Sequence, residues 1–273
     1  MDILNITEKP KIDQSIEEYE YHSYEPITDS DLNRPEEIRI NIETQDFFTH
    51  PSESYLVFGI KLIKNADDAV YTNADVITLT NNAMMHLFSS IKCQLSGQET
   101  ESLFHPGQAK TMLGLLKFTD DFQKSTGRNQ LWYKNAGTDA SIAGNNQNNV
   151  FLARQQYIIQ KPDPKGTFSF RVPLKHIFGF CDDYEKVVYG FKHQLTLVRK
   201  GDNDAIFRNN AADAGKVVLS KLSWCMPLVT PNLQEILALY KSIESKSSLP
   251  VGYRMIQCNS IPVQQTRNFT WRL

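Results

Sequence analysis

Residues 168–190 read FSFRVPLKHIFGFCDDYEKVVYG, and residues 193–199 read HQLTLVR. Apolar and polar residues alternate up to Pro173 and again after Gly190, as they do in strands with one buried face. Pro173 is expected at the end of its strand, because proline has no backbone N–H to donate to a ladder. Between the strands we expect a tight apolar segment over residues 174–180 and a short helix over residues 182–189. This order of strand, turn, helix and strand contains nothing typical of an active site.

Similar alternation continues on both sides of this stretch. In residues 37–43 it places Ile38, Ile40 and Ile42 on one face. Gly97 is expected to form the turn of a hairpin. Strands are predicted over residues 37–43, 55–63, 75–80, 86–95, 99–103, 152–159, 167–173, 193–199 and 216–228. These nine ranges before Pro231 come to about the eight strands that build the two packed sheets of a jelly roll.

Helices are predicted at two places outside this pattern. Residues 109–118 carry Met112, Leu113 and Leu116 at helical spacing. Asn232 is expected to cap a helix over residues 233–245. The predicted inner face of this second helix consists of Ile236, Leu237, Tyr240 and Ile243. Two more strands are predicted over residues 251–263 and 269–273, and residues 135–149 read as a surface loop rich in Asn and Gly.

The charge of the chain is unevenly distributed. The 273 residues are 41% hydrophobic, which predicts a globular core, and the net charge of −2 gives no basic bias toward nucleic acid. Residues 1–36 hold ten acidic and three basic residues, a net of −7, whereas the remainder holds 21 acidic and 26 basic residues, a net of +5. We therefore predict that residues 1–36 are a disordered acidic arm that does not bind phosphate backbones.

The cysteines and the N-terminal residues indicate in which cellular compartment the protein is expected. Cys93, Cys181, Cys225 and Cys258 form no CxxC pair and lie among apolar residues, so reduced buried thiols are predicted. The chain opens on no secretory leader and has no apolar run long enough to cross a bilayer. We expect an intracellular protein, in cytoplasm or nucleus, without a membrane partner.

The sequence contains no convincing set of catalytic residues. Nucleophile-elbow, phosphate-loop, zinc-protease and dinucleotide motifs are absent from the sequence. Asp120–Asp121 and Asp182–Asp183 are interpreted as residues at helix starts rather than as paired catalytic acids. Trp132, Tyr133 and Trp224 are interpreted as core aromatics rather than as a sugar-stacking platform.

The sequence also lacks a convincing set of metal ligands. His176 and Cys181 are interpreted as a packed histidine beside a buried thiol. The six histidines have no ligand spacing on one element; they are His22, His50, His86, His105, His176 and His193. We therefore predict no catalytic, cofactor-binding or metal site, and no small-molecule substrate.

Several segments together resemble one known family. They are residues 96–103 (SGQETESL), 109–118, 171–180 (RVPLKHIFGF), 223–227 (SWCMP) and 252–255 (GYRM), in that order. Over residues 37–273 the chain resembles the first half of a double jelly-roll major capsid protein of double-stranded DNA viruses and of virus-derived elements in animal genomes. The resemblance implies a mainly all-β jelly-roll domain over residues 37–230. Residues 231–273 would then be a linker helix and the first strands of a truncated second jelly roll.

The resemblance also implies a function. The chain is expected to be a non-enzymatic structural protein without a cofactor, which self-assembles into trimeric capsomers and resides in the virion if its gene is viral. Because the sequence stops at Leu273, we expect a fragment or a domesticated remnant, and assembly by this chain alone stays open.

Two alternatives remain open. One is a domesticated module that binds protein or carbohydrate through residues 131–149. The other is a cupin-like metalloenzyme, which needs histidines and a carboxylate facing the barrel interior. The predicted strands carry mainly Ile, Leu, Val, Phe, Ser and Thr, so a filled interior is favoured.

Overall fold

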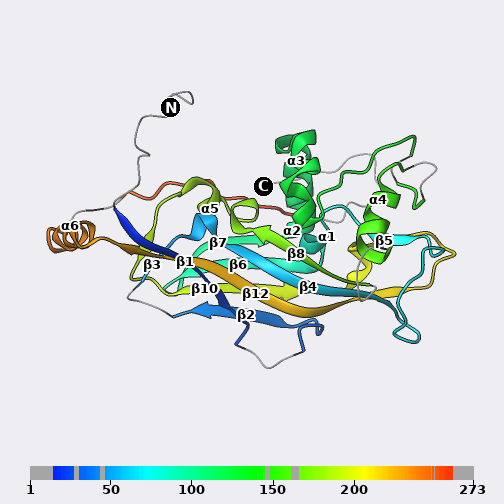
Figure 1. Ribbon diagram of the computed structural model, residues 1–273, viewed down its shortest axis with the longest axis horizontal. Coiled ribbons are helices and arrows are strands. Elements are labelled where there is room, and N and C mark those ends of the chain that lie inside the picture. The colour runs from blue at the N-terminus through cyan, green and yellow to red at the C-terminus, as the bar shows by residue number, and fades with distance from the viewer. Residues whose placement is uncertain are drawn as a thin grey trace, which may run out of the picture.

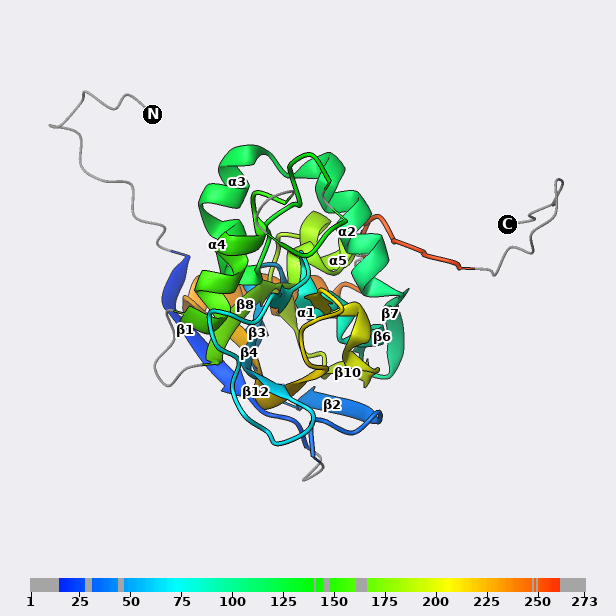
Figure 2. The same cartoon turned by 90° about the vertical axis from the view of Figure 1, so that its right-hand side faces the viewer.

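The computed structural model describes residues 15–27, 31–43, 47–139, 141–144, 148–160, 166–246, 248 and 250–260. Its centre is a sandwich of two antiparallel sheets, sheet A and sheet B (Figure 1). The predicted β-sandwich with short helical excursions is confirmed. Four helices gather on one side of the sandwich in both views (Figures 1 and 2): α2 (Pro106–Lys117), α3 (Asp120–Lys124), α4 (Phe151–Gln155) and α5 (Gly179–Asp183).

Sheet A is organised around its longest strand, β12. The strand order is β8–β4–β12–β3–β9, and β1 also pairs with β12. Trp224 of β12 pairs with Leu56 of β4 and with Tyr24 of β1, so β4 and β1 lie on opposite edges of β12. The bounds are β1 (Ile16–Tyr24), β3 (Phe48–Thr49), β4 (Tyr55–Lys64), β8 (Thr167–Pro173), β9 (Val188–Tyr189) and β12 (Gly215–Pro231).

Sheet B has four strands, in the order β2 (Glu37–Ile42), β10 (His193–Arg199), β6 (Phe88–Leu95) and β7 (Gln98–Phe104). In β2 the predicted alternation is confirmed, because Ile38, Ile40 and Ile42 are all buried. Ser96 and Gly97 have φ values of 47° and 84°, the left-handed conformation of tight hairpin turns. The predicted hairpin at Gly97 is therefore confirmed, and β7 is left at the edge of the sheet.

Short elements surround the sandwich. A third sheet consists of β5 (Ile77–Leu79) and β11 (Ile206–Arg208). The α-helices are α1 (Ala83–His86), α2 (Pro106–Lys117), α3 (Asp120–Lys124), α4 (Phe151–Gln155), α5 (Gly179–Asp183) and α6 (Leu233–Glu244). The 3₁₀ turns are η1 (Pro51–Glu53), η2 (Thr126–Gln130), η4 (Leu174–His176) and η5 (Asp202–Asp204), and η3 (Gln156–Gln160) is a π-helix.

Side chains fill the space between the sheets. Phe58 of sheet A and Phe88 of sheet B are both fully buried, with ring centroids 6.0 Å apart. Farther along, the His193 ring of sheet B meets the Trp224 ring of sheet A edge-on at 6.1 Å. Such contacts give the sandwich a close-packed interior of the kind that stabilises a domain.

The N-terminal arm departs from the sequence prediction. Ile16–Tyr24 is not disordered but forms β1, which pairs with β12 from Pro231 to Trp224. Nearly all of its side chains are exposed, so the strand is held by backbone pairing to an otherwise open edge rather than by an apolar face. Residues 1–14 lie outside the described residues.

The predicted strand over residues 152–159 is wrong, because the buried residues of this segment repeat with the period of a helix. Residues 152–159 were expected to form a strand, yet they belong to α4 and η3. The buried positions Phe151, Arg154, Gln155 and Ile158 follow a spacing of three to four residues, which is that of a helix. The side chain of Arg154 is fully buried, and its Nη1 donates to the carbonyl of Tyr133 at 2.8 Å.

The C-terminal elements also differ in part from expectation. The predicted helix after Asn232 is confirmed as α6, and the Asn232 side chain accepts from the backbone N–H of Glu235 at 2.9 Å. Its predicted inner face is wrong, because no residue of α6 is buried and Leu237 is 58% exposed. Helix α6 lies beyond the end of β12 (Figure 1), and the hydroxyl oxygen of its Tyr240 is 3.2 Å from that of Tyr189 in β9. Residues 251–260 contain no strand, and 261–273 lie outside the described residues.

Candidate functional site

Clusters with obvious chemistry are absent from the described part of the chain. No group of three or more His, Cys, Asp or Glu side chains gathers there in a way that could hold a metal ion. None of the helices in these ranges is both long and apolar enough to span a bilayer. The remaining candidates for a functional site are buried polar groups and cavities.

His176 is half-buried against aromatic side chains, and Cys181 belongs to the packed interior. The ring of His176 contacts the rings of Phe118 and Phe122 at centroid distances of 5.4 and 5.5 Å. Its Nδ1 lies 2.8 Å from Oε1 of Gln130, and burial lowers its pKa to about 4. Cys181 is 1% exposed, and burial raises the pKa of its thiol. The packing of the histidine and the burial of the thiol are confirmed, whereas the expectation that the two lie side by side stays a prediction.

The two aspartate pairs have different roles. Asp120 and Asp121 lie in the first turn of α3, whose N-cap Thr119 accepts from the backbone N–H of Phe122, as predicted. Asp182 and Asp183 end α5 instead of starting a helix, so that prediction is wrong. A two-residue strand, β9, occupies part of the range where the helix was expected. Asp182 and Asp183 form ion pairs with the basic side chains of Lys117 and Arg254.

The aromatic candidates are buried. Trp132, Tyr133 and Trp224 are 2%, 9% and 1% exposed, which confirms the interpretation as core aromatics. The loop that follows Tyr133 is described only in part, because residues 140 and 145–147 are outside the described ranges.

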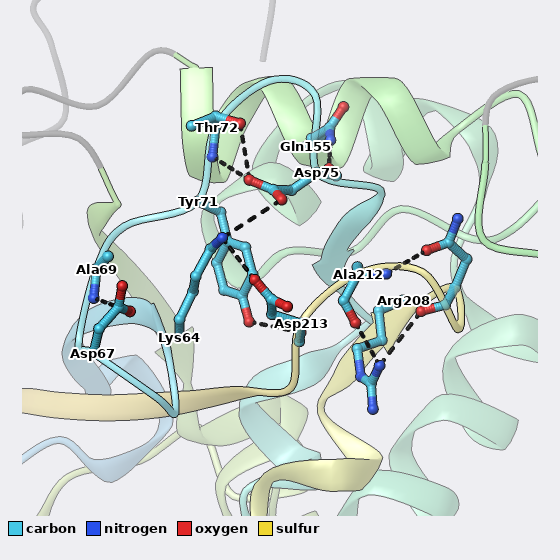
Figure 3. Close-up of polar contacts among 11 residues, drawn as sticks. Lys64, Asp67, Ala69, Tyr71, Thr72, Asp75, Gln155, Arg208, Ala212 and Asp213 are labelled. Carbon is cyan, nitrogen blue, oxygen red and sulfur yellow. Dashed lines mark hydrogen bonds and ion pairs between the residues drawn. The ribbon is translucent and has the colours of Figure 1, made fainter.

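A polar cluster ties loops together at the end of the molecule that carries β5 and β11 (Figure 3). Asp75 accepts from the backbone N–H of Thr72 at 2.7 Å and from its hydroxyl at 2.8 Å, and these bonds lower the pKa of Asp75. Lys64 lies between Asp213, at 2.8 Å, and Asp75, at 3.8 Å. Gln155 donates to the Asp75 carbonyl at 2.6 Å. Because the charges and donors are paired within the cluster, its role is to hold the loops.

A second polar arrangement holds residues 253–256 against strand β7 and helix α5. Tyr253 donates its hydroxyl proton to the carbonyl of Thr100 at 2.9 Å. The backbone N–H of Ile256 donates to Oε1 of Glu101 at 3.2 Å. The other oxygen of Glu101 accepts from the backbone N–H of Phe180 at 3.2 Å. We call this arrangement the β7 seat; it consists of Thr100, Glu101, Gly179, Phe180 and Asp183.

Electrostatics strengthen the β7 seat at its two carboxylates. Glu101 is 0% exposed, and its pKa is raised by burial, against the effect of the N–H groups that it accepts from. Asp183 accepts from the backbone N–H of Arg254 at 2.7 Å and pairs with its guanidinium. These bonds lower the pKa of Asp183 to about 2. One carboxylate thus satisfies buried backbone, and the other neutralises a cation.

Gly179 is the point of closest approach in the β7 seat. A Cβ atom at this position would overlap the carbonyl oxygen of Arg254. Only glycine therefore allows α5 and residues 253–256 to lie this close.

Replacing Gly179 by Ala is expected to release residues 253–256 from the seat. The overlap is with backbone, which cannot rotate away as a side-chain end could. Trypsin should then cleave after Arg254 roughly ten times faster, since local opening controls access to the protease. Gly201→Ala is the matched control, because a Cβ there meets nothing within 4 Å. Equal cleavage rates in the two variants would contradict the role assigned to Gly179.

Beside the β7 seat lies a cavity of about 480 Å³, which we call the α2 cavity. Helix α2 lines one side, and α5 and residues 254–256 line another. Its apolar lining residues are Met85, Leu113, Leu116, Phe118, Trp132, Val172, Phe178, Met255 and Ile256. Its cationic lining residues are Lys110, Lys117, Lys175 and Arg254, against one carboxylate, Asp182.

Sequence reasoning missed both the β7 seat and the α2 cavity, although one signal was present. Glu101 lies two residues before the buried Leu103, so a period-two pattern places its carboxylate on the buried face of β7. The partners of Glu101 come from residues about 80 and 155 positions farther along the chain, and no local pattern identifies them.

The two-layer antiparallel sandwich, with its filled interior and a long central strand, defines a jelly-roll protein. A family model, the double jelly roll-like domain, matches residues 77–273. The chain belongs to this family. No match was found among curated proteins.

Several solved structures share the fold at low sequence identity. The Faustovirus major capsid protein is 12% identical, with a TM-score of 0.52 over 88% of this chain and 59% of that one. A chain of the Sputnik virophage particle is 12% identical, with a TM-score of 0.56 over 85% and 51%. PBCV-1 VP54, fitted into a reconstruction of Sputnik, is 11% identical, with a TM-score of 0.51 over 84% and 46%. The chain thus spans about half of the length of these structures.

Proposed function

We propose that this chain is the first barrel of a capsid-type structural protein, which acts by associating with further copies in a particle. The observation that carries the proposal is the structural similarity to solved structures, one of which is a major capsid protein. The similarity covers at least 84% of this chain in each comparison. The filled interior supports it, because large buried side chains such as Phe58 and Phe88 occupy the space between the two sheets.

The proposal includes the organisation of the chain. Residues 37–230 form the jelly-roll domain, extended by β1, and residues 231–273 lead toward a second barrel. Trimeric capsomers and a place in the virion are the finer parts of the proposal. They are supported by the fold match alone.

Exposed apolar side chains indicate where association would bury surface. Helix α6 presents Leu233, Leu237, Tyr240 and Ile243, which are 67%, 58%, 45% and 52% exposed. Monomeric proteins seldom leave such a row of large apolar residues uncovered, so contact with another copy is expected there.

Association can be measured by analytical ultracentrifugation and electron microscopy of the purified chain. We expect trimers or larger arrays that grow with protein concentration. Leu237→Glu should weaken this association at least tenfold, because a buried leucine contributes about 1.5–3 kcal/mol. Gln234→Glu adds the same charge at an exposed position of α6 outside this row and should have little effect.

Two results would count against these ideas separately. A chain that stays monomeric at every concentration contradicts self-association by this chain. Association that is unchanged by Leu237→Glu contradicts the role of α6 and leaves the capsid-type function standing.

A further inference from the structure

Lys110 is a buried cation that is attracted by Glu101 and Asp182 but forms no hydrogen bond or ion pair with any residue that the structure describes. Its residue is 9% exposed, in the middle of α2, and its side chain lines the α2 cavity. An ammonium group in such a place is costly unless an anion comes to it.

The other cations of the α2 cavity already have partners. Lys117 pairs with Asp182 at 2.7 Å, and Lys175 pairs with Glu53 at 3.0 Å. Arg254 pairs with Asp183. Within the part of the chain that the structure describes, Lys110 is therefore the one lining cation left for an incoming anion.

The rest of the α2 cavity is suited to an apolar group. Buried Trp132 and Phe178 form part of its wall, whereas Leu116 at its rim is 87% exposed. The lining of the cavity thus includes both a solvent-exposed residue, Leu116, and the buried Lys110. A volume of about 480 Å³ lies within the range of small-molecule sites.

We propose that the α2 cavity binds a small amphipathic carboxylate, whose head group pairs with Lys110 and whose apolar body contacts Trp132 and Phe178. Binding needs no covalent step: the carboxylate enters ionised, and the pair forms inside an apolar wall where a charge-assisted hydrogen bond is strong. The sequence alone pointed to no small-molecule site, because Lys110 reads as an ordinary residue of an exposed helix.

Decanoate and decanol are matched probes for this site, since they share a chain and differ in charge. Calorimetric titration of the purified chain at pH 7 should give at least tenfold tighter binding for decanoate. Lys110→Met keeps the length of the side chain and removes its charge, so it should abolish the preference for decanoate. Lys124→Met, an exposed lysine on α3 outside the lining, should preserve it.

A measurement on the unmodified chain guards against a variant that fails to fold. Burial lowers the pKa of Lys110 to about 8, while Glu101 on β7 and Asp182 on α5 raise it and Lys117 on α2 lowers it. Decanoate affinity should therefore fall at least tenfold between pH 7 and pH 10, and decanol affinity should not change. Equal affinity for the two probes, or a preference that survives both Lys110→Met and pH 10, would overturn the proposal.

Discussion

Replacing Glu101 by Ala is expected to lower the free energy of unfolding by about 3 kcal/mol. The carboxylate is fully buried and accepts the backbone N–H groups of Phe180 and Ile256. Removing it leaves two N–H groups without a protein acceptor, and each orphaned buried group costs roughly 1–3 kcal/mol. Relief of the desolvated charge offsets part of that cost. Chemical denaturation followed by tryptophan fluorescence measures the change.

Glu99→Ala is the matched control for this loss. Glu99 lies on the same strand with 46% of its side chain exposed, and it pairs with Lys92 at 2.9 Å. Its removal should change stability by less than about 0.5 kcal/mol, as is usual for a surface position. Hydrogen exchange should accelerate at the amides of Phe180 and Ile256 only in Glu101→Ala. Equal stability of the two variants would show that the β7 seat does not depend on Glu101.

Replacing Lys110 by Met is expected to raise the free energy of unfolding at pH 7 by up to about 3 kcal/mol. Burial displaces the pKa of Lys110 from 10.5 to about 8, and each pKa unit corresponds to about 1.4 kcal/mol. A buried methionine carries no such penalty, since its side chain is apolar. Thermal or chemical unfolding of the two proteins at a series of pH values measures the difference.

The sign of the pH dependence follows from linkage. Between pH 8 and pH 10.5 the unfolded chain holds the Lys110 proton more tightly than the folded chain does, so the stability of the unmodified protein rises with pH across this window. Below pH 8 both states are protonated and the full cost is present; above pH 10.5 neither is, and the cost is gone. The advantage of Lys110→Met should therefore shrink as the pH rises through the window. An advantage that is constant from pH 7 to pH 11, or its absence, would contradict an unpaired buried ammonium group.

Most of the sandwich could be predicted because its strands carry their own pattern. The alternation at Ile38, Ile40 and Ile42, and the left-handed turn at Gly97, are local properties that hold wherever the segment packs. The capped start of α6 is also local, since Asn232 acts on a backbone N–H three residues away. The failure at residues 152–159 was of another kind, because a short apolar run fits strand and helix alike.

The strand edge, the β7 seat and the α2 cavity depended on the folded chain. β1 forms because a distant strand, β12, offers an unpaired edge to a segment whose own side chains favour solvent. Glu101, Lys110 and Gly179 are unremarkable where they stand in the chain. For Glu101 and Lys110, burial shifts the pKa because the free energy of a charge depends on the groups around it. For Gly179, the backbone of Arg254 leaves no space for a side chain. In each case the surrounding groups come from residues far away in the sequence.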